Sequence, residues 1–309
     1  MGIFRAQRIT TLALSALATL VAAPSVSADE VQRLQGLYTT DMVDAQFHAP
    51  LQHDTGTTPG GLPVTTPFNA DMVNVENIVG DGEDVYVAVL DTGLLPDWPF
   101  FFSEADIAMG YCKGFTHELS WDPALMDITV GPLKDDRGCI TELASGHGTH
   151  VTSTVVGFNI NNGEWIRGIA PHVTIIPVLV LDAWVVDVPG VGPIGLSGGT
   201  DEMIAAGIEY VADLELDGRV VINMSLGGPD RSPVIEAAVD YAISQGVVVV
   251  ASAGNSGTDG MGYPGGLPQL ISTAAAGWAQ MFAAPGSWRG DLPENPMSND
   301  ILGNNTQFY

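Results

Sequence analysis

Basic residues are scarce in this chain of 309 residues. Ten Lys and Arg side chains stand against 36 Asp and Glu side chains, which gives a formal net charge of -26, and only Lys113 and Lys134 are lysines. A surface this acidic repels nucleic-acid phosphates and anionic lipid headgroups, so we expect neither as a partner. Two explanations of the acidity stay open, namely plain solubility and the binding of a structural calcium ion.

Cysteine is equally rare. The chain has only Cys112 and Cys139, which lie 27 positions apart, and no Cys-x-x-Cys pair. This excludes the thiol motifs typical of zinc sites and redox enzymes. In an exported chain we expect the two to form a disulfide, which would stabilise the fold by about 3 to 4 kcal/mol. Two free thiols are the alternative.

Long apolar runs are missing, apart from a short one near the N-terminus. Arg5 and Arg8 precede an apolar run from Ile9 to Ala23, and small residues follow it. This pattern predicts a signal peptide over residues 1–28 and a secreted protein, extracellular or periplasmic, that begins near Asp29. An uncleaved signal acting as a membrane anchor is the alternative. No later stretch reaches the roughly 18 apolar residues of a membrane span.

Residues 29–68 are loosely patterned and rich in Thr, Pro and Gly, so we interpret them as an N-terminal extension or short pro-segment. From residue 69 the texture changes to that of a folded domain, which we assign to residues 69–309. Its clearest element is the unbroken apolar run from Val85 to Leu90, which is typical of a strand buried on both faces.

Strand and helix patterns then alternate along the domain. We predict further strands and helices at these places: strands 173–181, 219–224 and 247–250; helices 69–79, 147–156, 201–214 and 233–245, the last with Ser232 as its N-cap and Gly246 as its stop. Residues 94–143 and 189–199 are predicted to be loops. Alternation of this kind predicts an α/β fold of three layers, with a mostly parallel central sheet between helices.

Two polar residues stand where such a sheet places its chemistry. Asp91 ends the first predicted strand, and His147, between two glycines, begins a predicted helix. An aspartate that accepts from an imidazole fixes its tautomer, so that the other ring nitrogen can take a proton from a nucleophile. On this pattern alone His147 could equally be structural, or could form half of a metal site with His150.

Five segments in order resemble the subtilisin-like serine proteases, the subtilase family. They are Val87-Ala88-Val89-Leu90-Asp91-Thr92-Gly93, Gly146-His147-Gly148-Thr149-His150-Val151, Gly168-Ile169-Ala170-Pro171, Asn223-Met224-Ser225-Leu226-Gly227-Gly228 and Ala253-Gly254-Asn255-Ser256-Gly257. The resemblance covers residues from about 68 to about 276. It implies a subtilisin-like αβα fold and a secreted serine endopeptidase of the peptidase S8 family that needs no cofactor for its chemistry.

The resemblance also implies roles for individual residues. Asp91 would orient His147, the general base, while Asn255 would donate a hydrogen bond to the oxyanion and His150 would be structural. The strand edge that binds the substrate main chain would be formed by Ser225, Leu226, Gly227 and Gly228. The first specificity pocket would be lined by Ser252, Ala253, Gly254, Gly262 and Tyr263. Because these residues are small, we expect a large apolar or aromatic side chain before the cleaved bond.

The chain departs from the family pattern at one decisive place. The family's nucleophile lies in a Gly-Thr-Ser-Met-Ala type of motif after the oxyanion asparagine, and no such motif occurs in this sequence. We therefore expect the catalytic domain to be incomplete at its C-terminus, with the serine beyond Tyr309. As written, the chain would be inactive, since the groups that remain accelerate hydrolysis by only about 10³- to 10⁴-fold over water.

Two functions other than an active subtilase fit parts of this sequence. An aspartic protease also uses Asp-Thr-Gly, but it needs two copies on an all-β fold, and here Asp91-Thr92-Gly93 is the only copy. The second rival is a catalytically inactive, subtilase-like protein that binds peptides without cutting them. In either subtilase reading the partner is a protein or peptide, and we expect a monomer with no membrane span once the signal is removed.

Overall fold

The computed structural model describes residues 64–67, 70, 73, 75, 80–144, 146–160, 164–254 and 260–274. Most of its strands form one seven-stranded sheet in the order β12-β11-β10-β2-β7-β3-β4, in which only β3 and β4 are antiparallel. The strands of this sheet are β2 (Val85–Asp91), β3 (Lys113–Asp122), β4 (Asp127–Arg137), β7 (Thr174–Leu179), β10 (Arg219–Met224), β11 (Val248–Ser252) and β12 (Ile271–Thr273).

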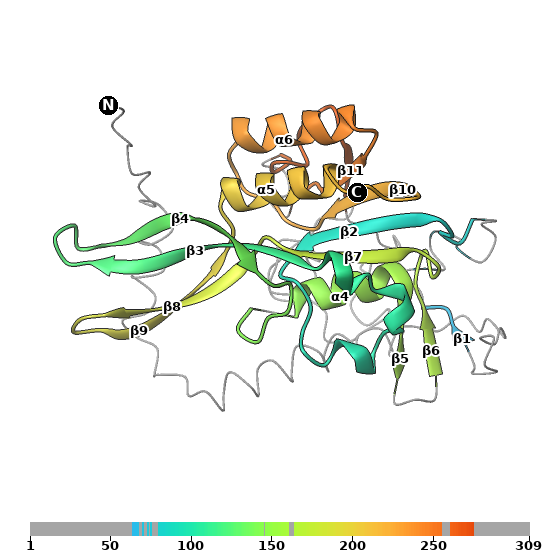
Figure 1. Cartoon of the computed structure of the whole chain (residues 1–309), viewed down its shortest axis with the longest axis horizontal. Coiled ribbons are helices and arrows are strands. Elements are labelled where there is room, and N and C mark those ends of the chain that lie inside the picture. Colours follow the sequence, from blue (N-terminus) through green and yellow to red (C-terminus); the bar gives the residue numbers. More distant parts are fainter. Residues whose placement is uncertain are drawn as a thin grey trace, which may run out of the picture.

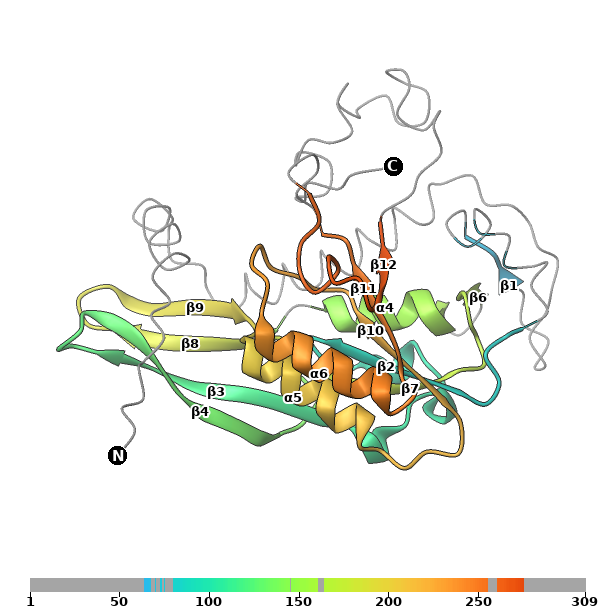
Figure 2. The same ribbon diagram turned by 90° about the horizontal axis from the view of Figure 1, so that it is seen from above.

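Helices cover both faces of this sheet. The helix α4 (His147–Val156) lies on one face, and α5 (Asp201–Ala212) and α6 (Pro233–Ser244) lie side by side on the other (Figures 1 and 2). The place of β2 between the two helix layers explains why its sequence is apolar from Val85 to Leu90. Ala88 and Leu90 belong to the core under α5 and α6, whereas Val87 and Val89 belong to the core that includes Val156 of α4. The predicted three-layer α/β fold is thus confirmed.

Local sequence signals set the ends of the helices. The hydroxyl of Thr200 accepts from the Met203 N–H at the start of α5, and Ser232 caps α6 as predicted. Gly246 follows α6 with a φ of +87°, which favours glycine. Gly207 lets α5 approach the residue that follows β7, since a Cβ there would lie 2.5 Å from a methyl carbon of Val180.

The two predicted loops are wrong. Residues 94–143 contain three short 3₁₀ turns (Trp98–Phe100, Glu104–Asp106 and Met109–Tyr111) and the long β3–β4 hairpin. Residues 182–198 form a second hairpin of β8 (Asp182–Val188) and β9 (Gly192–Gly198). Proline and glycine at 189 and 190 mark only its turn.

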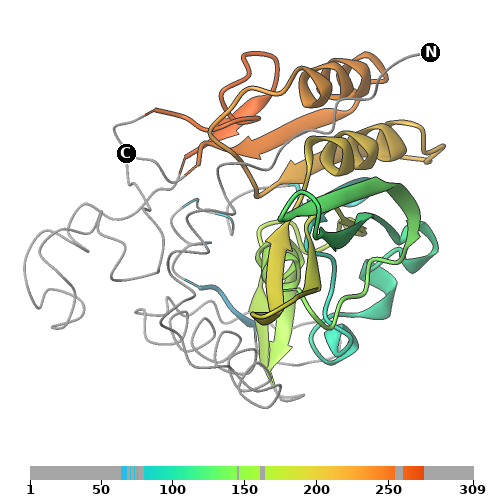
Figure 3. The same cartoon turned by 90° about the vertical axis from the view of Figure 1, so that its left-hand side faces the viewer.

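The two hairpins lie together and project past the carboxyl end of β2 (Figure 1), so that they point toward the viewer in Figure 3. They share a small apolar core of their own, which holds Val186, Val188 and Ile194 from the second hairpin and Leu119, Trp121 and Ile128 from the first. Because this core is separate from those around the sheet, the hairpin pair is an extension of the domain with its own apolar packing.

A small three-stranded sheet completes the described part, in the order β1 (Val64–Thr65), β6 (Glu164–Arg167), β5 (Gly157–Ile160). The strand β1 belongs to the predicted N-terminal extension, so the end of that extension pairs with the domain. The predicted signal peptide and the rest of the extension lie outside the described residues, as does most of the predicted helix 69–79. None of the described helices is long and apolar enough to cross a bilayer.

Cys112 and Cys139 are joined in a disulfide, with their Cα atoms 5.3 Å apart. The bond ties the residue before β3 to a residue just after β4, and so it closes the base of the first hairpin.

We expect the double variant Cys112→Ser/Cys139→Ser to lose about 3 to 4 kcal/mol of unfolding free energy, because a loop of this length gains entropy when opened. Urea unfolding followed by circular dichroism measures the difference. A reducing agent should destabilise the parent chain and leave the double variant unchanged. Equal unfolding free energies for parent and variant would refute this account.

Candidate active site

The centre of the site is the contact between Asp91, at the end of β2, and His147, the first residue of α4. Nδ1 of His147 lies 2.8 Å from one carboxylate oxygen of Asp91 and 2.9 Å from the other. The Asp91 side chain is fully buried, and it also accepts from the Thr92 N–H at 2.7 Å. The imidazole is 45% exposed. A buried acid therefore orients a ring that reaches the surface.

The sequence allows this contact by bringing two backbones unusually close. A Cβ on Gly148 would lie 2.3 Å from the carbonyl oxygen of Gly93, so only glycine fits at this point of α4. Two side-chain bonds fasten the same contact. The Gly148 N–H donates to the Thr92 hydroxyl at 2.9 Å, and the Leu95 N–H donates to the Thr149 hydroxyl at 3.0 Å.

The contact fixes the chemistry of the imidazole. With Nδ1–H donating to the carboxylate, Nε2 carries the lone pair of the neutral ring and is the nitrogen that can accept a proton. The hydrogen bond to Asp91 raises the pKa of His147 above its usual value, and burial partly opposes this rise. An imidazole of this kind can act as a general base near neutral pH.

His150 lies one turn further along α4 and behaves differently. Burial, and then the neighbouring charge of His147, lower its pKa to about 4. Its main-chain carbonyl accepts from the Ser153 hydroxyl at 2.7 Å. A histidine that stays neutral in this way suits the structural role that the resemblance implied. Within the described ranges, no group of three or more His, Cys, Asp and Glu side chains is placed to hold a metal ion.

The predicted strand edge and pocket meet beside one another. Ser252 at the end of β11 donates its hydroxyl to the Leu226 carbonyl at 3.1 Å, which joins the two segments. Gly228 and Tyr263 exchange both main-chain hydrogen bonds, at 2.8 and 2.9 Å. Gly228 is therefore already paired within the chain. The strand edge predicted over Ser225 to Gly228 therefore ends one residue earlier, at Gly227.

Two glycines of the predicted pocket, Gly254 and Gly262, lie beside each other. The Gly262 N–H donates to the Ala253 carbonyl at 2.9 Å. Gly254 has a φ of +92°, and a Cβ there would lie 3.3 Å from the Gly262 nitrogen. Asn255 and Ser145 lie outside the described residues, so the role of Asn255 stays a prediction.

The chain's own sequence gave no separate signal for the supporting residues Thr92 and Thr149. Thr92 directly follows Asp91, however, and Thr149 stands two residues after His147 in the first turn of α4, and short hydroxyl side chains often bond to the main chain. That adjacency could have identified them.

His150 makes stability depend on pH in one direction. Its folded pKa of about 4 lies below the unfolded value near 6.5, so its contribution is full above pH 6.5 and is lost as the pH falls toward 4. Between pH 6.5 and pH 4, we expect the unfolding free energy of the parent chain to fall by roughly 2 to 4 kcal/mol more than that of His150→Gln. The raised pKa of His147 acts in a separate window, above pH 6.5.

Denaturant unfolding at several pH values between 4 and 7.5 measures this difference. The matched control is His172→Gln, since the His172 side chain is 60% exposed and lies 4.0 Å from Asp81. Parallel curves for the parent and His150→Gln would show that His150 is not held neutral.

The comparisons with known proteins agree with this geometry. A sequence profile described as "Subtilase family" matches residues 82–303. Subtilisin DY of Bacillus licheniformis is 32% identical over 223 residues, which cover 71% of this chain and 64% of that protein. A subtilisin of Bacillus pumilus is 37% identical over 215 residues, which cover 68% and 63%.

Other relatives are matched over a smaller share. Fervidolysin of Fervidobacterium pennivorans is 36% identical over 195 residues, which cover 63% of this chain and 24% of that protein. A solved structure, the S41 psychrophilic protease, is 30% identical with a TM-score of 0.45, covering 65% of this chain and 56% of that one. The chain thus spans between about a quarter and two thirds of these relatives. With the profile matching most of its length, the chain belongs to the Subtilase family.

Proposed function

We propose that the protein containing this sequence is a secreted serine endopeptidase. Asp91 orients the imidazole, His147 removes the proton from a serine outside residues 1–309, and the Asn255 amide donates to the oxyanion. The observation that carries the proposal is the contact of His147 Nδ1 with both oxygens of the buried Asp91 carboxylate. The family membership supports it.

The described residues supply the steps around proton transfer. As the serine oxygen attacks the peptide carbonyl, Nε2 of His147 takes its proton, and the ionised Asp91 stabilises the imidazolium that forms. The imidazolium then returns this proton to the leaving amine. The role of Asp91 in this scheme is to orient the ring and to stabilise its positive charge.

The substrate main chain would pair with the strand edge at Ser225 to Gly227. In the described part of the chain, the main-chain N–H and C=O of Gly227 have no partner, in contrast to those of Gly228. Main-chain pairing of this kind binds many sequences, so selectivity falls to the pocket.

A fluorophosphonate probe tests the catalytic proposal on the complete protein. We expect the probe to label a serine, and His147→Ala to reduce the labelling rate by about 10⁴-fold or more, because an unactivated serine is a poor nucleophile. The matched control His172→Ala changes an exposed histidine that lies 4.0 Å from Asp81, before the starts of β7 and β2, and should keep the parent rate.

Undiminished labelling of His147→Ala would show that another group is the base. A complete protein that folds, binds peptides and carries no labelled serine would favour the inactive peptide-binding protein.

The pocket makes a prediction about specificity. A Cβ on Gly262 would lie 3.1 Å from the Gly228 carbonyl oxygen and 3.9 Å from that of Ala253, between the two sides of the proposed pocket. We expect Gly262→Val in the complete protein to lower kcat/KM for peptides with Phe before the cleaved bond by roughly 10- to 200-fold relative to peptides with Ala there.

Steady-state cleavage of a matched pair of Phe and Ala peptides gives this ratio. The control is Gly110→Ala, where an added Cβ meets nothing within 4 Å. If Gly262→Val left the ratio of Phe to Ala unchanged, Gly262 would not line the pocket.

A further inference from the structure

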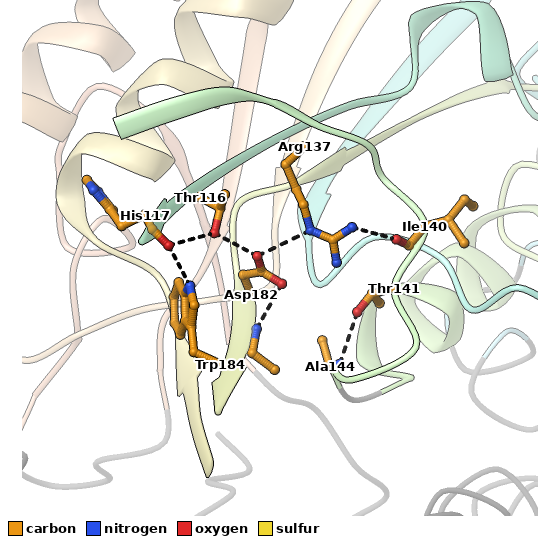
Figure 4. Close-up of polar contacts among 9 residues, drawn as sticks. Thr116, His117, Arg137, Ile140, Thr141, Ala144, Asp182 and Trp184 are labelled. Atoms are coloured by element: carbon orange, nitrogen blue, oxygen red, sulfur yellow. Dashed lines mark hydrogen bonds and ion pairs between the residues drawn. The ribbon is translucent and has the colours of Figure 1, made fainter. Parts of the chain in front are cut away.

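Asp182 is a buried carboxylate at the start of β8, outside the site described above. It is 4% exposed, and it accepts from the Thr116 hydroxyl at 2.7 Å, the Ala183 N–H at 2.9 Å and Nε of Arg137 at 3.4 Å (Figure 4). Burial of a carboxylate costs several kcal/mol, and a paired arginine offsets this cost without adding much net stability. Net stability therefore does not explain why this buried ion pair is present.

Arg137 also holds the loop that follows β4. Its Nη1 donates to the Ile140 carbonyl at 3.2 Å (Figure 4). Ile140 pairs with Leu94, since the Leu94 N–H donates to the Cys139 carbonyl at 2.8 Å and the Thr141 N–H donates to the Leu94 carbonyl at 3.0 Å. One arm of the guanidinium thus fixes the segment that clamps the chain three residues after Asp91.

The bond from Nε of Arg137 to Asp182 fixes a second backbone segment that contacts Asp91. The N–H groups of Val180 and Leu181 both donate to the Asp91 main-chain carbonyl, at 2.9 and 3.1 Å, and Asp182 is the next residue. The guanidinium of Arg137 therefore joins the two backbone segments that hold Asp91 and Leu94. A planar guanidinium can donate in both directions at once, whereas the compact ammonium of lysine cannot reproduce this fork.

We propose that Arg137 and Asp182 are positioning residues, which hold the Asp91 carboxylate in register with the His147 imidazole. The inference rests on the proposed function, since it concerns the same pair of groups. It also gives the root of the hairpin pair a role, because Arg137 ends β4 and Asp182 begins β8. The polar contacts of Thr116 and Trp184 in Figure 4 brace that root.

The test uses the 309-residue chain and NMR, so it needs no serine. The readouts are the pKa of His147, from its ring resonances against pH, and the resonance of its Nδ1 proton. We expect Arg137→Lys to lower the His147 pKa by roughly half a unit or more and to move the Nδ1 proton upfield, because the carboxylate is held less well. If Arg137→Lys does not fold, Arg137→Gln/Asp182→Asn removes both charges and should give the same result.

Two control variants separate positioning from general stability. Lys134→Met removes the exposed ion pair of Lys134 with Glu118 on the same hairpin, whose atoms lie 3.0 Å apart. Ile128→Ala weakens the small core of the hairpin pair without touching Arg137. Both should keep the parent values for His147.

The proposal would be overturned if the folded Arg137 variants kept the parent pKa and Nδ1 proton resonance of His147. It would also be overturned if Ile128→Ala changed these two readouts as much as the Arg137 variants do. In the complete protein, Arg137→Lys should lower kcat about tenfold or more with little change in KM, because small misplacements of a catalytic group act on the chemical step. Absence of probe labelling would refute the proposed function and leave the NMR result standing, so the two failures are distinguishable.

Discussion

The site depends on the close approach of two backbones, at the end of β2 and at the start of α4. Gly148 meets the carbonyl of Gly93 where any side chain would collide. Gly93 in turn has a φ of +76°, and a Cβ there would lie 2.1 Å from the carbonyl oxygen of Cys139. Three chain segments therefore meet without side chains between them. This backbone packing brings Asp91 within reach of His147.

The register of the parallel sheet explains why the other site residues gather at the same level. Asn223 of β10 pairs with Val89 of β2, so Ser225, two residues on, stands level with Asp91. Met224 pairs with Ala251 of β11, which places Ser225 level with Ser252. Because parallel strands run in one direction, one level of their carboxyl edge carries Asp91 together with the residues of the proposed binding edge and pocket.

The elements that form this edge could be predicted from the sequence because each carries an unambiguous pattern. The strand β2 is apolar from Val85 to Leu90, and α6 has both a serine cap and a glycine stop. Only the second hairpin was missed for a physical reason. In β3 the apolar side chains alternate with polar ones, which is a strand signal that could have identified it, whereas the proline and glycine near β9 belong to a turn between strands, which a loop would also contain.

The ion pair of Arg137 and Asp182 could not have been predicted, since the two residues lie 45 positions apart and only the packing of two unpredicted hairpins brings them together. The pairing of Asp91 with His147 spans 56 positions. Their positions at the ends of predicted elements made this pairing one of several possibilities, and the family resemblance selected it. Long-range contacts between polar groups leave no periodic signal in a single sequence.

Asp91 and Asp182 are the two buried aspartates among the described residues, and each has a cation suited to a different task. Asp182 is paired with an arginine, whose charge is permanent, so its contact with β4 persists at any working pH. Asp91 is paired with a histidine, whose charge changes when a proton is taken or returned. A permanent charge beside Asp91 would hold the carboxylate equally well, but it could not move a proton. On the two proposals made above, the permanent pair of Arg137 and Asp182 holds backbone segments in place while the pair of Asp91 and His147 moves a proton, and neither pair could replace the other.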